Sequence, residues 1–201
     1  MIIDLGTGDG RAALALAEAE PTTLVIGMDA DAASMAETSR RAARTTPRGG
    51  RANLVFVVAA AETPPAELIG VADDVRILFP WGSLLRGVLG RDARIARGIA
   101  ALARPGARIT ATVSVTPADG VGGIGALDAA TIADAAAGLR RAGLHLTGSR
   151  RVDRDEVRAT RSTWGRRLLG TAGDRPVWRL EFAFEPRSTE ADGRRVPEPA
   201  V

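Results

Sequence analysis

The chain has 201 residues, 45% of them hydrophobic, which is enough for about one domain with a substantial core. It contains no apolar run near the roughly 20 residues that span a bilayer, and its amino terminus lacks the pattern of a signal peptide. A cytoplasmic location is therefore expected. The lack of cysteine and the single histidine, His145, argue against a disulfide framework, a metal site and a Ser-His-Asp triad.

The formal net charge is only +3, and every basic residue is an arginine. Codon bias in a GC-rich genome is one explanation for this choice, but the distribution of the arginines is uneven. Residues 1–39 contain one arginine and seven acidic residues, whereas residues 140–179 contain eleven arginines and four acidic residues. This asymmetry indicates an anionic partner for the carboxyl-terminal half, because the planar guanidinium donates two parallel hydrogen bonds to a phosphate.

Short apolar runs alternate with longer helical patterns along the chain. The apolar runs predict strands at 1–5, 23–29, 53–59, 74–79, 107–115, 144–152 and 177–184. The helical patterns predict helices at 11–20, 31–45, 83–103 and 127–143, with Asp31 as the cap of the second. This alternation predicts an α/β fold with a mainly parallel sheet and helices on both faces.

The two late strands, with an irregular segment between them, predict an antiparallel hairpin at the edge of the sheet. Residues 1–184 are expected to form one domain. The polar, proline-bearing segment 185–201 is expected to be a disordered tail.

A glycine turn, Gly6 to Gly10 in "DLGTGDG", directly follows the first predicted strand. Asp29 ends the second strand about 20 residues later, where a carboxylate holds the hydroxyls of a ribose. The third glycine comes one residue too early for the dinucleotide fingerprint G-x-G-x-x-G, and Asp4 before the turn suits a cationic ligand better than a pyrophosphate. The alternative is that these glycines only make a tight turn. The pattern is similar to the first motif of class I S-adenosylmethionine (SAM) methyltransferases.

Phe79-Pro80-Trp81-Gly82 stands at the end of the fourth predicted strand, where nucleic-acid amino-methyltransferases of that class carry (Asp/Asn)-Pro-Pro-aromatic. Trp81 is either a flat wall on which a flipped base stacks or a core residue that covers the end of the sheet. Trp164 lies in the polar, arginine-flanked stretch "RSTWGRRLLG", and this polar setting argues against a simple core role for Trp164. Two tryptophans from two loops would sandwich a purine.

Four segments, "DLGTGDGR", "AAAE", "LFPWGSLLRGVLG" and "STWGRRL", resemble in order and spacing the aminoglycoside-resistance 16S rRNA methyltransferases of the Kam and Npm type. The resemblance runs from Asp4 to about Phe184. It implies a Rossmann-like class I methyltransferase with a seven-stranded sheet and an antiparallel last strand. It also implies SAM as cofactor and methylation of N1 of adenine 1408 in 16S rRNA. The expected partner is the 30S subunit, and the expected oligomeric state is a monomer.

The resemblance also implies a set of site residues. Cofactor contacts are implied for Asp4, Gly6, Thr7, Gly8, Asp29, Ala61, Glu62, Leu78, Phe79, Pro80, Trp81, Gly82, Ser83, Ser162, Thr163 and Trp164. Catalytic roles are implied for Trp81, Trp164 and Pro80, and RNA contacts for Arg166, Arg167 and Arg175.

Two departures from the family pattern lead to further expectations. Family members carry a β-hairpin before the glycine motif, whereas this chain starts inside the first predicted strand; either the hairpin is missing or the start is misassigned. The arginine cluster after the tryptophan segment is also less dense than in relatives. Two other functions remain open: a small-molecule methyltransferase of the same fold, and a non-catalytic RNA-binding relative.

Overall fold

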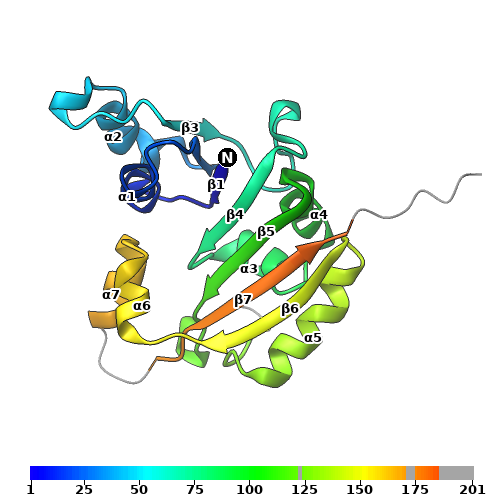
Figure 1. Ribbon diagram of the computed structural model, residues 1–201. Helices are drawn as coiled ribbons and strands as arrows, with labels where there is room; N and C mark the ends of the chain where they lie inside the picture. The colour runs from blue at the N-terminus through cyan, green and yellow to red at the C-terminus, as the bar shows by residue number, and fades with distance from the viewer. Residues whose placement is uncertain (122–123, 171–174, 186–201) are drawn as a thin grey trace, which may run out of the picture.

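The computed structural model describes residues 1–121, 124–170 and 175–185, and these residues contain one seven-stranded sheet. The strand order is β3-β2-β1-β4-β5-β7-β6 (Figure 1). Strands β1 to β5 pair in parallel, whereas β7 is antiparallel to both β5 and β6. The predicted α/β fold and the predicted antiparallel edge are therefore confirmed.

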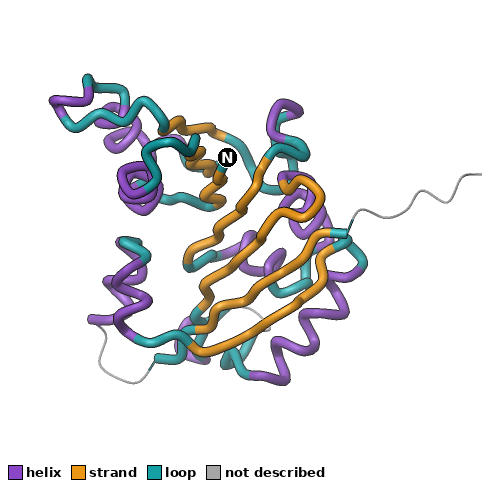
Figure 2. The backbone as a smooth tube through the Cα atoms, in the orientation of Figure 1, coloured by secondary structure: helices purple, strands orange, loops and turns teal. Residues whose placement is uncertain are grey.

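Strands and helices alternate along the chain, as the tube in Figure 2 shows. The strands are β1 (Ile2–Leu5), β2 (Val25–Asp29), β3 (Leu54–Val58), β4 (Ala72–Leu78), β5 (Ala103–Val113), β6 (Leu144–Arg151) and β7 (Trp178–Phe184). The helices are α1 (Arg11–Ala19), α2 (Ala32–Ala42), α3 (Gly82–Val88), α4 (Ala93–Leu102), α5 (Ala129–Arg140), α6 (Arg154–Ala159) and α7 (Thr163–Gly170). As predicted, Asp31 caps α2: its side chain accepts from two backbone N–H groups of the first turn.

Two of the predicted helical assignments are wrong. The helix predicted at 83–103 is two helices, α3 and α4, because the chain turns at 89–92 and the Asp92 side chain caps a new first turn. The segment between β6 and β7, expected to be irregular, contains α6 and α7. The start of α6 is a capping box in which Asp153 and Glu156 bind each other's backbone N–H. Of the predicted tail 185–201, all but residue 185 lies outside the described residues.

The two faces of the sheet differ in what covers them. Helices α3, α4 and α5 cover one face with the main apolar core, and α1 and α2 cover the β2 and β3 end of the other face with a smaller cluster (Figure 1). In the described part of the chain, no helix lies over the rest of that second face, the front of β4, β5, β7 and β6 in Figure 1. No helix among the described residues is long and apolar enough to cross a membrane.

Helices α6 and α7 are attached to the sheet by a third apolar cluster, separate from the main core. Phe79, directly after β4, packs there with Val157 of α6, Leu168 of α7 and Val177. Gly165 of α7 lies over the Phe79 ring so closely that a Cβ atom at this position would stand 2.7 Å from Cε2. A side chain at residue 165 would therefore push α7 away from the end of β4.

Gly165→Ala is expected to destabilise the protein by about 1–3 kcal/mol, the usual cost of overpacking a filled site. Gly170→Ala is the matched control: it lies in the same helix with open space around it, and alanine is the better helix former there. Urea unfolding of both variants measures the difference. Equal stability of the two variants would contradict the packing described for Gly165.

Candidate active site

The glycine turn after β1 takes a conformation that favours glycine. Gly6, Gly8 and Gly10 have φ values of 73°, 57° and 73°, all in the left-handed region. The Gly6 N–H donates to the carbonyl of Met28, which ties the turn to the end of β2. The turn therefore runs beside the next strand, at the carboxyl end of the parallel sheet where ligands bind in such folds.

The Asp29 carboxylate, at the end of β2, is held by two backbone donors. The Gly8 N–H donates to Oδ2 at 2.8 Å, and the Asp31 N–H donates to Oδ1 at 2.9 Å. Because these bonds fix the carboxylate beside the turn, its remaining lone pairs are oriented before any ligand arrives.

Asp4, in β1, is a buried acid, with 2% of its surface exposed. Its Oδ2 accepts from the Thr7 hydroxyl at 2.6 Å, and its Oδ1 has no hydrogen-bond partner within the described ranges. Burial raises the pKa of Asp4 to about 6, although the Thr7 hydrogen bond and the charge of Arg76 oppose the rise. A buried carboxylate oxygen without a donor marks a place for a polar or cationic ligand.

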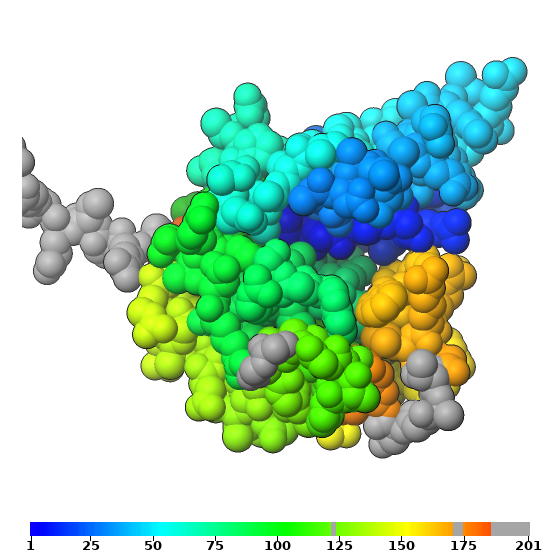
Figure 3. Space-filling model, turned by 180° about the vertical axis from the view of Figure 1, so that it is seen from behind, coloured from blue at the N-terminus to red at the C-terminus, as the bar shows by residue number. Residues whose placement is uncertain are grey.

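A cavity of about 850 Å³ brings most of the implied cofactor residues together. Its lining includes Asp4, Gly6, Thr7, Gly8, Asp29, Ala61, Glu62, Leu78, Phe79, Pro80, Trp81, Ser83, Ser162, Thr163 and Trp164. Gly82, the first residue of α3, is not part of the lining. The lining also includes residues that the sequence analysis did not assign to the site, among them Asp9, Asp31 and Ser34. Seen from behind, the orange surface of α7 lies directly below the dark blue amino-terminal residues; these two parts of the chain border the cavity (Figure 3).

The two tryptophans lie at this cavity and are exposed: 48% of the Trp81 surface and 41% of the Trp164 surface face solvent. A core role is therefore wrong for both. Their ring centroids are 6.2 Å apart and their planes are inclined by 60°. The two residues come from different elements, since Trp81 is the cap of α3 and Trp164 is in α7.

Backbone strain accompanies both tryptophans. Phe79 and Arg161 are the described non-glycine residues with positive φ, at 51° and 57°. Each precedes one of the tryptophans by two or three residues. Such conformations cost about 1–3 kcal/mol each and persist where the surroundings enforce them, often at functional sites.

The three arginines with implied RNA contacts have different environments. Arg166 is exposed, and its guanidinium donates to the Thr163 hydroxyl at 3.3 Å. Arg167 lines the cavity, with its guanidinium carbon 5.9 Å from the centroid of the Trp164 ring. Arg175 is turned inward: it donates to the Asp119 carboxylate and to Ser114, and only 16% of its side chain is exposed. The Arg175 guanidinium therefore binds groups of the protein itself.

The fold and the site together define a class I SAM-dependent methyltransferase: the strand order places the glycine turn, Asp29 and the end of β4 around one cavity. Residues 1–182 match the family described as 16S rRNA (adenine(1408)-N(1))-methyltransferase, and the chain belongs to that family.

Individual relatives agree with this assignment. The 16S rRNA (adenine(1408)-N(1))-methyltransferase of Streptoalloteichus hindustanus is 37% identical over 173 residues, which are 84% of this chain and 80% of the relative. A mutant of the enzyme of that name from Catenulisporales acidiphilia, solved with its cosubstrate SAM, is 36% identical with a TM-score of 0.83; the match covers 92% of this chain and 86% of the other. The aminoglycoside resistance methyltransferase NpmB1 is 36% identical over the same shares, with a TM-score of 0.72.

Asp4→Asn is expected to change how stability depends on pH. The folded-state pKa of about 6 lies above the ordinary 3.8, so the acid form of Asp4 favours folding. That contribution is complete below about pH 4 and is lost as the pH rises through about 6. Because asparagine does not titrate, the variant should gain stability over the wild type by up to about 3 kcal/mol between pH 4 and 8. Urea unfolding of the ligand-free proteins across this range measures it, and a constant difference would contradict the buried acid.

Proposed function

We propose that this protein transfers a methyl group from SAM to N1 of adenine 1408 in 16S rRNA, within the decoding site of the 30S subunit, and so confers aminoglycoside resistance. The observation that carries the proposal is the pair of exposed indoles at the mouth of the cavity that Asp4, the glycine turn and Asp29 line. Family membership supports the same substrate.

The residues of the cavity fit SAM. Asp29, fixed beside the glycine turn by the Gly8 N–H, accepts from both ribose hydroxyls in this proposal, and the unpartnered buried oxygen of Asp4 suits a cationic ligand. Asp9, Asp31 and Glu62 make the lining more acidic, which favours a ligand that carries positive charge. When bound, SAM supplies an electrophilic methyl group whose transfer to adenine N1 moves the positive charge from sulfur to the base.

Trp81 and Trp164 hold the flipped adenine between their faces. Stacked rings lie about 3.4 Å apart, so a base between two parallel indoles needs about 7 Å between the indole planes. The inclined rings, with centroids 6.2 Å apart, therefore separate and rotate when the base enters. Two indole faces also stabilise the positive charge that develops on the ring, each by up to about 2 kcal/mol when desolvated.

Alignment is the main catalytic contribution of the chain. Adenine N1 is a neutral lone pair at pH 7, so a general base is not required. The carbonyl of Pro80, which lines the cavity between β4 and α3, accepts from the adenine amino group and fixes the orientation of the ring. Holding N1 in line with the methyl group lowers the barrier by several kcal/mol, about the scale of other proximity effects.

The direct test is incubation of the protein with 30S subunits and labelled SAM, followed by reverse transcription across the decoding site. A stop at adenine 1408 is expected. Transfer of the label to a small molecule but not to 30S subunits would support a small-molecule methyltransferase. Binding to 30S subunits without SAM binding would support a non-catalytic RNA-binding relative. Label on 30S subunits at another nucleotide would contradict the target.

Trp81→Ala and Trp164→Ala should each abolish most of the methylation while the melting temperature stays close to wild type. Stacking is worth about 1–3 kcal/mol per base, and both side chains are half exposed. Trp81→Phe retains a π face and should keep part of the activity. Primer extension on 30S subunits beside thermal melts measures this; full activity in either alanine variant contradicts the clamp.

Asp29→Ala should weaken SAM binding by more than about tenfold, because two ribose hydroxyls lose their acceptor. Calorimetry without RNA measures the affinity. Glu37→Ala, which removes an exposed carboxylate on α2, is the control and should bind as the wild type does. Unchanged affinity in Asp29→Ala would overturn the ribose assignment.

Arg166→Ala should weaken 30S binding and reduce the slope of log affinity against log salt by about one, because one phosphate contact and its released counterion are lost. SAM affinity should not change, since Arg166 does not line the cavity. Arg175→Ala should instead lower the melting temperature, because Asp119 loses its partner. An unchanged salt slope in Arg166→Ala would remove this residue from the docking surface.

A further inference from the structure

A second groove lies on the open front of the sheet, next to the cofactor cavity. Its volume is about 770 Å³; α1 and α6 form its walls, and β4, β5 and β7 form its floor. Asp4, Ala12 and Leu78 line both the groove and the cofactor cavity. Asp4 therefore borders both the groove and the cofactor cavity, and the charged residues on the floor of the groove lie on the same face of the sheet as Asp4.

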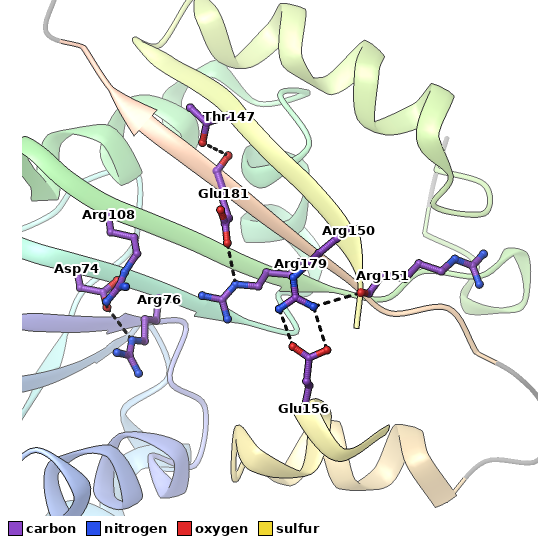
Figure 4. Close-up of polar contacts among 9 residues, drawn as sticks. All are labelled: Asp74, Arg76, Arg108, Thr147, Arg150, Arg151, Glu156, Arg179 and Glu181. Atoms are coloured by element: carbon purple, nitrogen blue, oxygen red, sulfur yellow. Dashed lines mark hydrogen bonds and ion pairs between the residues drawn. The ribbon is translucent and has the colours of Figure 1, made fainter. Parts of the chain in front are cut away.

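A row of charged side chains crosses this floor. Arg108 of β5 donates from Nη2 to Oδ2 of Asp74 at 2.8 Å, and Arg76 of β4 donates from Nε to the same oxygen at 2.9 Å (Figure 4). Asp74 itself is buried, with 6% of its side chain exposed. In the sheet register Arg76 is the β4 partner of Asp4 in β1. The row therefore ends at the strand that carries the cavity's buried acid.

We propose that Arg76 is a positioning residue for SAM binding: Asp74 holds its guanidinium on the floor of the groove, from where its charge keeps the neighbouring Asp4 carboxylate ionised and ready for a cationic ligand. The inference rests on the proposed function, in which Asp4 faces SAM. Arg76 touches neither substrate nor SAM; it acts through Asp4.

Burial and neighbouring charges act against the ionised form of Asp4. Burial favours the neutral acid, and the nearby acids Asp9 and Asp29 act in the same direction; the Thr7 hydrogen bond and, after it, the charge of Arg76 oppose them. The other charged residues that line the groove are Glu18, Glu20, Glu156, Arg161 and Arg179. Arg76 is the cation in the strand next to Asp4 and in register with it.

A purely structural role for Arg76 is disfavoured by its surroundings. About a third of its side chain is exposed, and Asp74 keeps Arg108 as a partner if Arg76 is removed. Arg76→Gln should therefore fold, and its effect should fall on Asp4. Arg108→Gln is the matched control, because it removes the same charge from the same carboxylate but one strand farther from Asp4.

The experiment measures SAM affinity of the full chain by calorimetry, without RNA, between about pH 5 and 8. The affinity of the wild type for SAM should fall as the pH drops, because protonation of Asp4 removes the negative charge that attracts the cationic ligand. Arg76→Gln should move the midpoint up by about half a pH unit or more, which is about twofold weaker binding at the wild-type midpoint and about threefold well below it. Arg76→Lys keeps the charge, so its midpoint should lie close to that of the wild type. Arg108→Gln should move the midpoint less than Arg76→Gln does.

Two results would overturn the inference: an unchanged midpoint in Arg76→Gln, or an equal shift in Arg108→Gln. Asp4→Asn separates this failure from failure of the proposed function. If that variant abolishes the pH dependence, Asp4 is the titrating group and only the role of Arg76 is at stake. If it binds SAM as the wild type does at every pH, Asp4 does not face SAM and the inference fails, while the proposed function stands; a wild-type chain that does not bind SAM would contradict the proposed function itself. Thermal melts at each pH verify that all variants remain folded.

Discussion

Phe79 leaves the end of β4 in the left-handed region of backbone conformation, and its ring packs beneath Gly165 in the cluster that attaches α6 and α7 to the sheet. The positions of both exposed indoles at the cavity depend on this contact. Trp81 follows Phe79 by two residues, and Trp164 directly precedes Gly165. The separation of the indoles is therefore set by the packing of one phenylalanine ring, and the strain at Phe79 is stabilised by the cluster it belongs to.

The strands and their mainly parallel pairing could be predicted from the sequence, because the strands are apolar runs that alternate with helical patterns. The glycine turn and Asp29 were also recognisable, since turn geometry and strand ends leave local signals. These features depend on residues close together in the chain, which is why pattern and structure agree there.

The features that the sequence did not predict depend on contacts between distant residues. Helices α6 and α7 are short, and α7 is fixed by Phe79, more than 80 positions away in the chain. Arg175 was expected at the RNA surface, yet it binds Asp119 across a long loop. One local signal was available and overlooked: the Asp153 to Glu156 spacing of a capping box announces the start of α6.

The number of arginines overstates the positive charge that this half of the protein offers to RNA. Arg150 binds Glu156 through both terminal nitrogens and so connects β6 to α6 (Figure 4). Arg158 pairs with Asp155, and Arg154 donates to the Leu169 carbonyl of α7. These arginines orient α6 and α7, whereas Arg166 and Arg167 on the same unit are exposed and are the ones that the proposed function assigns to the RNA.

Charge and shape therefore act on opposite sides of one cavity. Its amino-terminal wall is acidic and rigid, since Asp29 is fixed by backbone donors and Asp4 is buried. Its carboxyl-terminal wall is a small helical unit with an exposed indole and an arginine stacked against it. Under the proposed function, a cationic small ligand and a polyanion would therefore approach through different walls, and only the flipped base would reach between them. The indoles are too close and too inclined to admit a base without moving, so under the same proposal adenine entry and closure of the clamp would be one event. Selectivity would then fall on nucleotides that leave their stack at low cost, since indoles stack on any base by its face.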